Sequence, residues 1–461
     1  MQTMSPLDSA FLRLESRDTS LHIAAIGLFD GPAPTYSEIA DLVTAKLPLL
    51  PRYRQRVREV PLRLGRPVWV DDPRFSLRNH LKHTALPHPG SDTQLDELVS
   101  RVMSQQLDRS RPLWDTWIVE GLEGDRWALI TKVHHCMADG IAATDLLTTV
   151  LDRSPEGEPK IDDPWQAHDE PTGLQLLASA VTTLPHDPGW LVNAVSQALT
   201  HPRRTAVTAL LRLHGMLNFA ELARPATPSS LAGPIGSVRS WSKTQVTLDD
   251  VRLIKHAFGG TVNDVVLTAV TRGFREVLLG RGEWPARHAV RTLVPVSVRE
   301  ADERGHLDNR VSAVVAELPV HVSGPVARLR AVRAELDRLK TSGEPQAGEL
   351  VTGAANYIPP LLLSAGLSGI FRVPQRFIVT VATNVPGPSE PLYAVGRQLR
   401  ELYPYVPIAD RLRLGVAISS YADVLYFGVT ADRDSTPDAD VLVSGIEDAI
   451  RELVKLAEAE D

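Results

Sequence analysis

Apolar residues recur along the whole chain, either in short runs or at helical spacing, and polar or proline-rich turns separate them. The run at 127–133 predicts a buried strand, and the apolar positions of 141–151 repeat at the intervals of a helix. The same patterns predict strands over 21–29, 52–58, 68–70, 111–122, 240–246, 291–299, 311–318, 377–382, 414–420 and 424–429, and helices over 36–48, 94–107, 174–222, 248–258, 261–279, 325–340 and 440–458.

Local patterns also predict how some strands pair. Residues 111–122 alternate at period two, so we expect them to lie beside the strand that runs into His134. Residues 414–420 and 424–429 flank a three-residue turn and are expected to form a hairpin. The proline at 295 cannot donate to a ladder, which predicts an edge, a bulge or a strand end there.

Strands and helices alternate in both halves of the chain, which is typical of an α/β (α+β) protein built from facing layers. With 461 residues the chain exceeds one ordinary core, so two domains are expected. Prolines and acidic residues gather in 153–173, and a second loop rich in proline, glycine and serine follows at 224–237. We therefore divide the chain into an N-terminal half (1–152), a partly helical linker (153–237) and a C-terminal half (238–461).

The sequence is organised around the stretch from His134 to Gly140, His-His-Cys-Met-Ala-Asp-Gly. It joins the predicted strand at 127–133 to the helix at 141–151, so it reads as strand, turn, helix. A residue without Cβ such as Gly140 makes the sharp turn at little steric cost. Two adjacent histidines in an extended end point to opposite faces. One of them can therefore enter a cavity, and the other is expected to be structural.

Three chemistries compete for this turn. An imidazole can take a proton from an attacking hydroxyl and return it later, which is general base catalysis. His134, His135 and Asp139 could bind a metal, but the adjacent histidines point apart and no third histidine stands at ligand spacing. Cys136 could be a nucleophile activated by an imidazole, although no sequence neighbour orients such a pair.

Composition removes several classes of function. The chain is 43% apolar and 23% charged, as in an ordinary globular protein. Its net charge of -7 argues against nucleic acid as a partner. Cys136 is the single cysteine, which excludes disulfides within the chain and Cys₄ metal sites. The first residues show no signal peptide, so a cytoplasmic location is expected.

Three further polar clusters have simple structural explanations. Ser5 can cap a helix that starts at Pro6, with Asp8 at its positive end. Thr261 or Asn263 can do the same for the helix at 261–279, with Asp264 at its dipole. The arginines at 52, 54, 56 and 58 would share one face of a strand. That face is usually solvated, although one arginine pairing inward with a carboxylate is the alternative.

Two segments are candidates for contact with lipid. Residues 350–371 carry no charge and reach the length of a membrane span, but a proline pair and glycines favour a buried or lipid-facing helix pair. Residues 202–214 are basic and apolar and could lie on a membrane surface, or could equally pack on the protein itself. No short-period repeat is present.

The turn carries a resemblance to a known superfamily. Residues 134–140 match the HHxxxDG motif of the coenzyme A-dependent acyltransferases, which include chloramphenicol acetyltransferases and peptide-synthetase condensation domains. Pro6–Phe11 resembles the PLDxxF start of the bacterial wax ester synthase/diacylglycerol acyltransferase (WS/DGAT) family, and Asn263-Asp264 resembles its ND motif. The segments 111–114 and 384–388 also look like that family. Overall the chain is most similar to the bacterial triacylglycerol synthases.

The resemblance implies a fold and a reaction. The fold would be that of chloramphenicol acetyltransferase, with two similar halves around a tunnel. His135 would be the general base that moves an acyl group from long-chain acyl-CoA to the hydroxyl of diacylglycerol. Acyl-CoA is a substrate, and neither cofactor nor metal is implied. No acyl-enzyme is needed, so Cys136 should be dispensable, and His134 looks like a packing residue.

The resemblance also implies residues that support the acyl transfer without taking part in it as acid or base. Asp139 is implied to fix the turn by binding an arginine, with Arg54 as first candidate and Arg299 as second. Asn384 and the Gly140 amide are candidate donors to the oxyanion. The ND motif, Asn263-Asp264, would shape the second half's face of the tunnel.

Alternatives remain open at this stage. They are a long-chain fatty alcohol as acceptor, a non-catalytic relative that binds lipid or acyl-CoA, and a condensation-type enzyme acting on carrier-protein thioesters. A hydrophobic acceptor alcohol also implies peripheral contact with the inner membrane or with lipid droplets.

Overall fold

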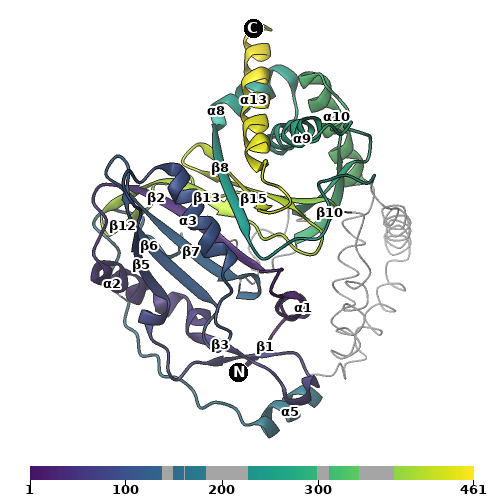
Figure 1. Ribbon diagram of the computed structural model, residues 1–461. Coiled ribbons are helices and arrows are strands. Elements are labelled where there is room, and N and C mark those ends of the chain that lie inside the picture. Colours follow the sequence, from purple (N-terminus) through teal and green to yellow (C-terminus); the bar gives the residue numbers. More distant parts are fainter. Residues whose placement is uncertain (138–148, 160, 183–226, 298–310, 342–377, 461) are drawn as a thin grey trace, which may run out of the picture.

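The computed structural model describes residues 1–137, 149–159, 161–182, 227–297, 311–341 and 378–460. Two six-stranded sheets, each with its own helices and apolar core, form two halves that lie against each other (Figure 1). This is the mixed α/β architecture with two sheet-rich halves that the sequence predicts. Among the described residues, no helix has both the length and the apolar character needed to cross a bilayer.

The N-terminal sheet has the strand order β12-β13-β2-β7-β6-β5. Antiparallel pairing joins β2 to β7 and β7 to β6, and β5 runs parallel to β6. The predicted pairing of 111–122 with the strand into His134 is therefore confirmed. The strands are β2 (His22–Asp30), β5 (Leu81–Ala85), β6 (Trp114–Leu122), β7 (Arg126–His134), β12 (Tyr393–Ala394) and β13 (Arg397–Tyr405).

Two strands of that sheet come from the far end of the chain. β13 pairs antiparallel with β2, from Leu399 opposite Phe29 to Tyr405 opposite Ala24, and β12 pairs with β13. The predicted C-terminal half, 238–461, therefore needs one correction. Its residues 393–405 belong to the sheet of the N-terminal half. The sequence of β13 does not look like a strand, because it contains charges at Arg400 and Glu401 and a proline at 404.

The C-terminal sheet has the order β10-β9-β11-β14-β15-β8. The predicted hairpin forms between β14 and β15, and its turn residues Ala422 and Asp423 adopt positive φ. In the part of the chain that the structure describes, β9 pairs beyond Leu293 with β10 alone, so Pro295 lies where the strand has one neighbour, as its chemistry requires. The strands are β8 (Arg239–Thr247), β9 (Val290–Ser297), β10 (Val311–Leu318), β11 (Thr380–Val385), β14 (Leu414–Tyr421) and β15 (Val424–Asp432).

Four helices gather on one face of the C-terminal sheet (Figure 1). They are α8 (Leu248–Phe258), α9 (Val262–Gly280), α10 (Pro325–Thr341) and α13 (Ala439–Glu458). The backbones of α9 and α13 cross at a pair of glycines, because a Cβ on Gly445 would lie 2.7 Å from the Cα of Gly273. Either glycine replaced by a larger residue would push the two helices apart.

The N-terminal half carries α1 (Pro6–Leu14), α2 (Tyr36–Lys46), α3 (Asp92–Ser104) and α5 (Gly173–Thr182). Short 3₁₀ helices occupy Leu47–Leu49, Pro51–Arg54, Pro61–Arg63, Leu77–Asn79 and His135–Met137. A small sheet of β1 (Gln2–Thr3), β4 (Val68–Asp71) and β3 (Gln55–Arg58) lies beside α5. Residues 52–54 are therefore a helical turn rather than the predicted strand, which begins only at Gln55.

The two halves meet where α3 covers the free edge of β8. The backbone N–H groups of Arg239 and Trp241 donate to the hydroxyls of Ser104 and Ser100, each at 2.9 Å. These serines in turn donate to carbonyls four residues earlier in α3. An edge strand that would otherwise expose unpaired donors is thus paired by side chains of the other half.

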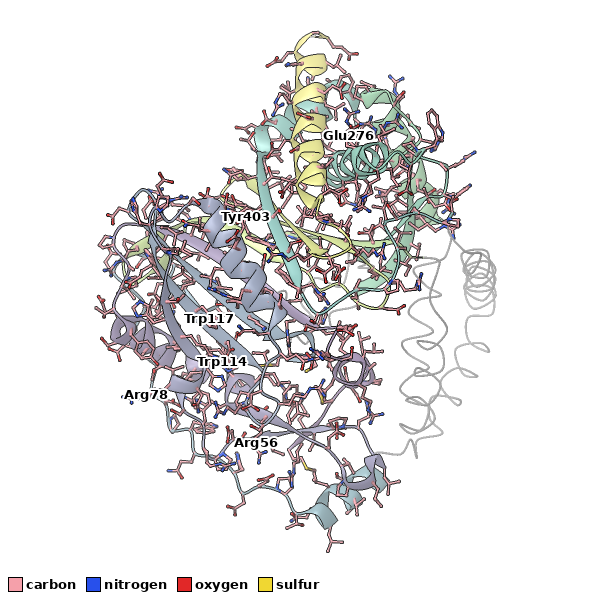
Figure 2. The ribbon with its side chains drawn as sticks, viewed as in Figure 1. Arg56, Arg78, Trp114, Trp117, Glu276 and Tyr403 are labelled. Atoms are coloured by element: carbon pink, nitrogen blue, oxygen red, sulfur yellow. The ribbon has the colours of Figure 1, made fainter. Side chains whose placement is uncertain are left out.

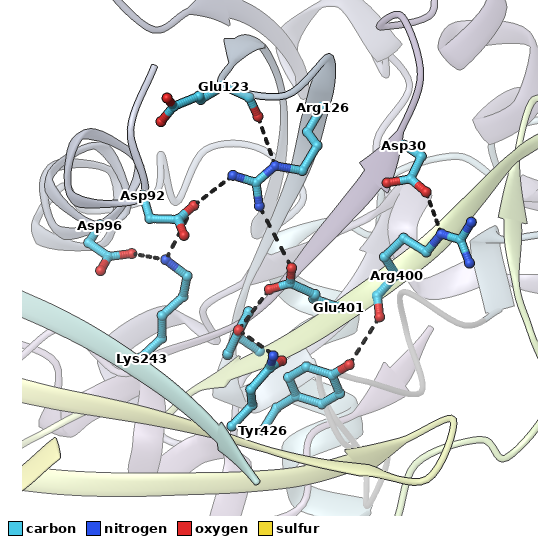
Figure 3. A network of polar contacts seen from close by, with 11 residues as sticks. Asp30, Asp92, Asp96, Glu123, Arg126, Lys243, Arg400, Glu401 and Tyr426 are labelled. Atoms are coloured by element: carbon cyan, nitrogen blue, oxygen red, sulfur yellow. Dashed lines mark hydrogen bonds and ion pairs between the residues drawn. The ribbon is translucent and has the colours of Figure 1, made fainter. Parts of the chain in front are cut away.

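Charged residues surround this contact (Figure 3). Lys243 of β8 pairs with Asp96 of α3 at 2.8 Å. Arg126 bridges Asp92 at 3.1 Å and Glu401 of β13 at 3.7 Å. The carboxylate of Glu401 accepts a hydrogen bond from Tyr403, which Figure 2 shows where the two halves meet. Strand β13, which belongs to the N-terminal sheet, therefore contacts both halves.

The linker follows the surface of the N-terminal half. Most of its described residues between 153 and 170 are exposed, as predicted. Its acidic side chains nevertheless bind the basic segment 46–58: Glu158 contacts Lys46 at 2.6 Å, Asp163 binds Arg54, and Glu170 contacts Arg56 at 2.7 Å. Arg54 and Arg56 thus pair with carboxylates, as the alternative expects, but these belong to the exposed linker and not to the interior, and Arg56 points from β3 toward this linker (Figure 2).

Candidate active site

The site begins where β7 ends. His134 is the last residue of β7, and residues His135–Met137 form a 3₁₀ turn. The turn is fixed by backbone hydrogen bonds on either side, from the His134 N–H to the Leu113 carbonyl and from the His135 N–H to the Leu21 carbonyl, both at 2.9 Å. A strand followed directly by a turn is what the sequence pattern predicts.

The two histidines have different surroundings. His134 is fully buried, and its Nδ1 accepts a hydrogen bond from the Cys136 N–H at 3.1 Å. His135 is only partly buried, and its ring lies 4.3 Å from the ring of Phe11 in α1. The structure thus separates a histidine inside the core from one at its border. Figure 1 shows α1, in purple, below the place where the two halves meet.

His135 has the protonation state that a general base needs. Burial lowers the pKa of its imidazole below the usual range, so the ring is neutral at neutral pH. Its Nδ1 is buried and contacts its own backbone. The other nitrogen of a neutral imidazole can then carry the lone pair that accepts a proton from a hydroxyl placed beside it.

Cys136 is poorly suited to nucleophilic chemistry. Its side chain is fully buried, and burial together with the carboxylates of Asp8 and Glu15 raises the pKa of the thiol well above its usual range. Because the thiolate is the reactive form, this cysteine is inert at neutral pH.

Behind the turn lies a buried polar cluster that the sequence analysis missed. Glu15 at the end of α1 faces His22 Nε2 at 2.9 Å and His134 Nε2 at 3.7 Å. Arg109 donates to the same carboxylate from Nε at 2.9 Å and from Nη2 at 2.5 Å. His22 and His134 are register partners in the β2–β7 ladder. No motif includes Glu15, His22 or Arg109, and only the antiparallel register of residues 22 and 134 could have suggested the contact.

The ND motif has two different members. Asp264 is buried and accepts from the N–H and hydroxyl of Thr261 at 2.6 and 2.9 Å, while Thr261 accepts from the Asp264 N–H at 3.3 Å. Of the two predicted N-cap residues, Thr261 is therefore the one that caps the helix, and Asp264 completes a capping box with it. Asn263 instead accepts a hydrogen bond from the side-chain amide of Asn384 at 3.4 Å. Two predicted site residues from α9 and β11 are thus brought together.

The structure describes only some of the other predicted site residues. Both terminal nitrogens of Arg54 bind Asp163, and its guanidinium lies 4.8 Å over the ring of Trp165. Asp139 and Gly140, like Arg299, lie outside the described residues. The pairing of Asp139 with an arginine therefore stays a prediction, as do the tunnel and the oxyanion donors.

A cleft of about 570 Å³ opens at the end of the 384–388 motif. Both halves of the sequence line it, through residues that include Leu49, Leu151, Pro388 and Leu392. Its volume falls in the range of small-molecule sites.

Comparison with known proteins identifies the family. The sequence pattern of the "Wax ester synthase/diacylglycerol acyltransferase catalytic domain" matches residues 4–266, and that of the "WS/DGAT C-terminal domain" matches residues 307–454. The chain belongs to the WS/DGAT family. The resemblance read from the motifs of residues 6–11, 134–140 and 263–264 is thus confirmed.

Several individual members are similar over nearly their whole length. A Mycobacterium tuberculosis chain named "probable diacylglycerol O-acyltransferase tgs1" is 42% identical over 459 residues, which cover 99% of this chain and 96% of that one. The chain named tgs2 from the same organism is 31% identical over 462 residues, covering 98% of this WS/DGAT member and 99% of the relative.

Solved structures agree with this assignment. The wax ester synthase/diacylglycerol acyltransferase from Marinobacter aquaeolei VT8 superposes with a TM-score of 0.68 at 26% identity, covering 99% of this chain and all of that one. The starter condensation domain of rhizomide synthetase superposes with a TM-score of 0.58 at 15% identity, covering 99% and 94%. This second likeness shows the shared fold, which is the one predicted from the HHxxxDG motif.

Proposed function

We propose that this WS/DGAT member transfers a long-chain acyl group from acyl-CoA to the free hydroxyl of diacylglycerol, giving triacylglycerol. The observation that carries the proposal is the position of His135, a neutral imidazole at the border of the core on the turn that defines the superfamily. A relative 42% identical over nearly the whole chain bears the name of that activity.

The reaction needs one base and no covalent intermediate. His135 takes the proton of the acceptor hydroxyl as its oxygen attacks the thioester carbonyl. The carbon–sulfur bond then breaks, and the departing CoA thiolate receives that proton from the imidazolium. Acyl-CoA serves as substrate, and neither a cofactor nor a metal takes part in this scheme.

Supporting residues complete the scheme. Asp139 and Gly140 shape the turn that presents His135, and Arg54 or Arg299 holds the Asp139 carboxylate. Asn384 or the Gly140 amide donates to the oxyanion while the tetrahedral carbon exists. The side-chain amide of Asn384 donates to Asn263 at the long distance of 3.4 Å, a weak hydrogen bond that it can exchange for one to the oxyanion. His134 and Asp264 support the backbone.

The first experiment measures thiol release from a long-chain acyl-CoA by the purified full-length protein, with diacylglycerol or with hexadecanol as acceptor. His135→Ala should lower kcat on the order of 10²–10⁴-fold. The matched control is His256→Ala on the exposed end of α8, which should keep full activity. Faster release with hexadecanol would replace the proposal by wax ester synthesis, which the family name also covers.

Other outcomes point to other classes. No release with either acceptor, or release that survives His135→Ala, would favour a protein that binds lipid without catalysis. Release from acyl-carrier protein but not from acyl-CoA would favour a condensation-type enzyme.

The proposal includes peripheral contact with the inner membrane or a lipid droplet on the cytoplasmic side, because the acceptor partitions into lipid. The two predicted segments, 202–214 and 350–371, lie outside the described residues. Within the described residues, an exposed apolar tip formed by Leu62 and Leu174 supports contact with lipid. Leu62 is 83% exposed at a positive φ that leucine rarely adopts, and Leu174 of α5 is 80% exposed. Gly173 packs on Pro61, which places these two leucines at one end of the molecule.

Basic residues flank this tip, which favours an anionic lipid surface. Arg58 is half exposed, although its Nε lies 3.2 Å from Glu170, and Arg13 donates to the Gly65 carbonyl at 3.4 Å. The double variant Leu62→Ser/Leu174→Ser should reduce cosedimentation with vesicles of phosphatidylglycerol and phosphatidylcholine. The matched control, Trp284→Ser, removes a side chain that is also 83% exposed but lies in the C-terminal half. Equal binding by all three proteins would remove this tip from the proposal.

A further inference from the structure

A groove of about 640 Å³ runs along α3 and is lined by both halves of the protein. One side of the helix forms its wall through Gln94, Leu98, Arg101 and Gln105, which follow one another at helical spacing. At 1.5 Å per residue, the wall from Gln94 to Gln105 is roughly 16 Å long. We call this space the α3 groove. Its volume lies in the range of small-molecule sites, and the acyl transfer proposed above does not use it.

The two ends of the α3 groove differ in polarity. Residues 85–87, Ala-Leu-Pro, line one end and carry no polar side-chain atom. A turn closed by the Gly90 N–H on the carbonyl of residue 87, at 2.9 Å, joins them to the start of α3. Arg239 and Arg433 line the other end, since the Arg239 N–H donates to Ser104 in the last turn of α3 at 2.9 Å. The groove therefore runs from an apolar end to a basic end.

The basic end holds guanidinium groups without a counter-charge. Within the described part of the chain, neither Arg101 nor Arg433 forms an ion pair or a side-chain hydrogen bond, and both side chains are exposed. Arg239 is only 2% exposed, its Nη1 lies 3.6 Å from Asp432, and both of its terminal nitrogens donate to backbone carbonyls. Two unpaired cations beside a buried guanidinium attract a negatively charged group.

Nearby carboxylates limit how much negative charge this end accepts. Glu97 lines the groove one helical turn before Arg101. Asp434 follows Arg433 and lies against Gly236, whose Cβ position is 3.4 Å from its carboxylate. A polyphosphate would meet both groups with like charge, whereas a single carboxylate is matched by the two free arginines. The charges around the groove therefore favour a monoanion.

The apolar end indicates what else such a ligand carries. Walls without polar side-chain atoms offer an anion no hydrogen bond, but they remove an alkyl chain from water favourably. Leu98 continues the apolar wall along α3, and Val238, which is 40% exposed, continues it toward the arginines. A ligand with an anionic head and an alkyl tail satisfies both ends of the groove at once.

We propose that the α3 groove binds a long-chain carboxylate, with its head between Arg101 and Arg433 and its alkyl chain along α3 toward residues 85–87. The ligand then bridges the two halves where α3 lies beside β8 (Figure 1). No lining residue belongs to the turn at 134–137, so this site goes beyond the proposed acyl transfer. Free fatty acid and acyl-CoA both combine an alkyl chain with an anionic head, and the charges of the groove favour the free acid.

Photolabelling of the full-length protein tests the location and the chemistry together. The probe is dodecanoic acid with a diazirine at the end of its chain, and labelled peptides are identified by mass spectrometry. The label should lie within residues 85–98, at the apolar end. Dodecanoate should displace the probe, whereas dodecanol should need a concentration about 10–100-fold higher, because it cannot form charge-assisted hydrogen bonds. Lauroyl-CoA, added alone as a third competitor, should compete no better than dodecanoate.

Variants separate the two ends of the groove. Arg101→Gln/Arg433→Gln should weaken displacement by dodecanoate about 10–100-fold and leave displacement by dodecanol unchanged. Ala85→Asp, which places a charge at the apolar end, should weaken both competitors. The matched control is Arg330→Gln, which removes an exposed arginine of α10 and should change neither. All four substituted side chains are exposed, so the unfolding midpoint without ligand should stay that of the wild type.

Three results would overturn the inference. A label confined to peptides that do not line the groove would place the ligand elsewhere. Equal competition by dodecanol and dodecanoate in the wild type would show that no anionic head is recognised. Stronger competition by lauroyl-CoA than by dodecanoate, lost in the arginine double variant, would make the groove part of the acyl-CoA site instead. If the wild type transferred no acyl group, the proposed function would fail, but the labelling would still decide whether the groove binds a carboxylate.

Discussion

Phe11 and His135 are far apart in sequence, yet their rings lie 4.3 Å apart with planes inclined by 42°. The helix start at Ser5 explains how. Ser5 accepts the Asp8 N–H at 3.1 Å, Pro6 takes the first helical position, and α1 then points Phe11 at the turn. The capping explanation of Pro6–Phe11 and its place in a family motif are therefore both correct, because the cap aims the helix that supports His135.

This contact predicts a selective effect of Phe11→Ala. Loss of the ring removes the surface on which the His135 imidazole rests, so we expect kcat to fall about tenfold through misplacement of the base. Phe11→Leu, which keeps apolar bulk at the same site, should retain most of the activity. The measurement is thiol release at saturating acyl-CoA. Equal activity of Phe11→Ala and the wild type would show that the ring contact is not needed.

Cys136 is predicted to be dispensable despite its place between two motif residues. Its buried thiol has a raised pKa, so the folded protein should resist iodoacetamide at pH 8 and react only after denaturation. Cys136→Ala should keep kcat, because the hydrogen bond to His134 uses the backbone N–H and not the side chain. Loss of activity on Cys136→Ala at unchanged stability would revive the nucleophile interpretation.

The histidine pair behind the turn predicts how stability depends on pH. Burial lowers the pKa of His22 to about 4 and that of His134 to about 3, against about 6.5 in an unfolded chain. Between these values the unfolded state binds more protons than the folded state. The stability that the neutral rings contribute is therefore complete above pH 6.5 and is lost as the pH falls toward 4 and 3.

Denaturant unfolding at several pH values checks this. Each histidine should contribute a slope of up to about 1.4 kcal/mol per pH unit in that window. Hydrogen bonding and charge interactions with His22, His134 and Arg109 lower the pKa of Glu15 from 4.5 to about 2, so Glu15 adds its own slope below about pH 4.5. The effect of the histidines is therefore measured between pH 4.5 and 6.5. His22→Gln should reduce the slope, whereas His256→Gln on the exposed end of α8 should leave it intact. An identical slope for both variants would contradict the assignment to His22.

The features that the sequence predicted are those that neighbouring residues determine. The strand and turn at 127–137, the N-cap at the start of α9, and the hairpin turn at 421–423 each follow from local periodicity, side-chain capping or turn chemistry. The motif residues also indicated the family, because they are the ones the chemistry requires in a fixed order.

The features that the sequence analysis missed depend on contacts between distant segments. β13 carries charges and a proline, and only pairing with β2 makes it a strand. Arg54 looks solvated until Asp163 is brought against it from the linker. Glu15 reads as one more surface acid after a helix, and only the register of β2 against β7 brings two histidines near its carboxylate, His22 at 2.9 Å and His134 at 3.7 Å.

The linker's ion pairs differ in burial, and this predicts which one matters for stability. Lys46 is buried at the end of α2 and contacts Asp152 at 2.9 Å and Glu158 at 2.6 Å. Asp152 is buried too, and its backbone exchanges two hydrogen bonds with Tyr393 of β12. This one residue therefore joins the linker, α2 and the strand that arrives from the C-terminal part of the chain.

Lys46→Met should consequently lower the free energy of unfolding by about 3–5 kcal/mol, because it leaves the buried Asp152 carboxylate without its cation. It should also speed limited proteolysis between residues 153 and 170, since the linker loses its first attachment. The matched control is Arg451→Met on α13, whose pair with Asp448 is exposed and should contribute less than about 1 kcal/mol. An equal loss of unfolding free energy in Lys46→Met and Arg451→Met would contradict this prediction. It would mean that the hydrogen bonds with Tyr393, and not the ion pair, hold Asp152 in place.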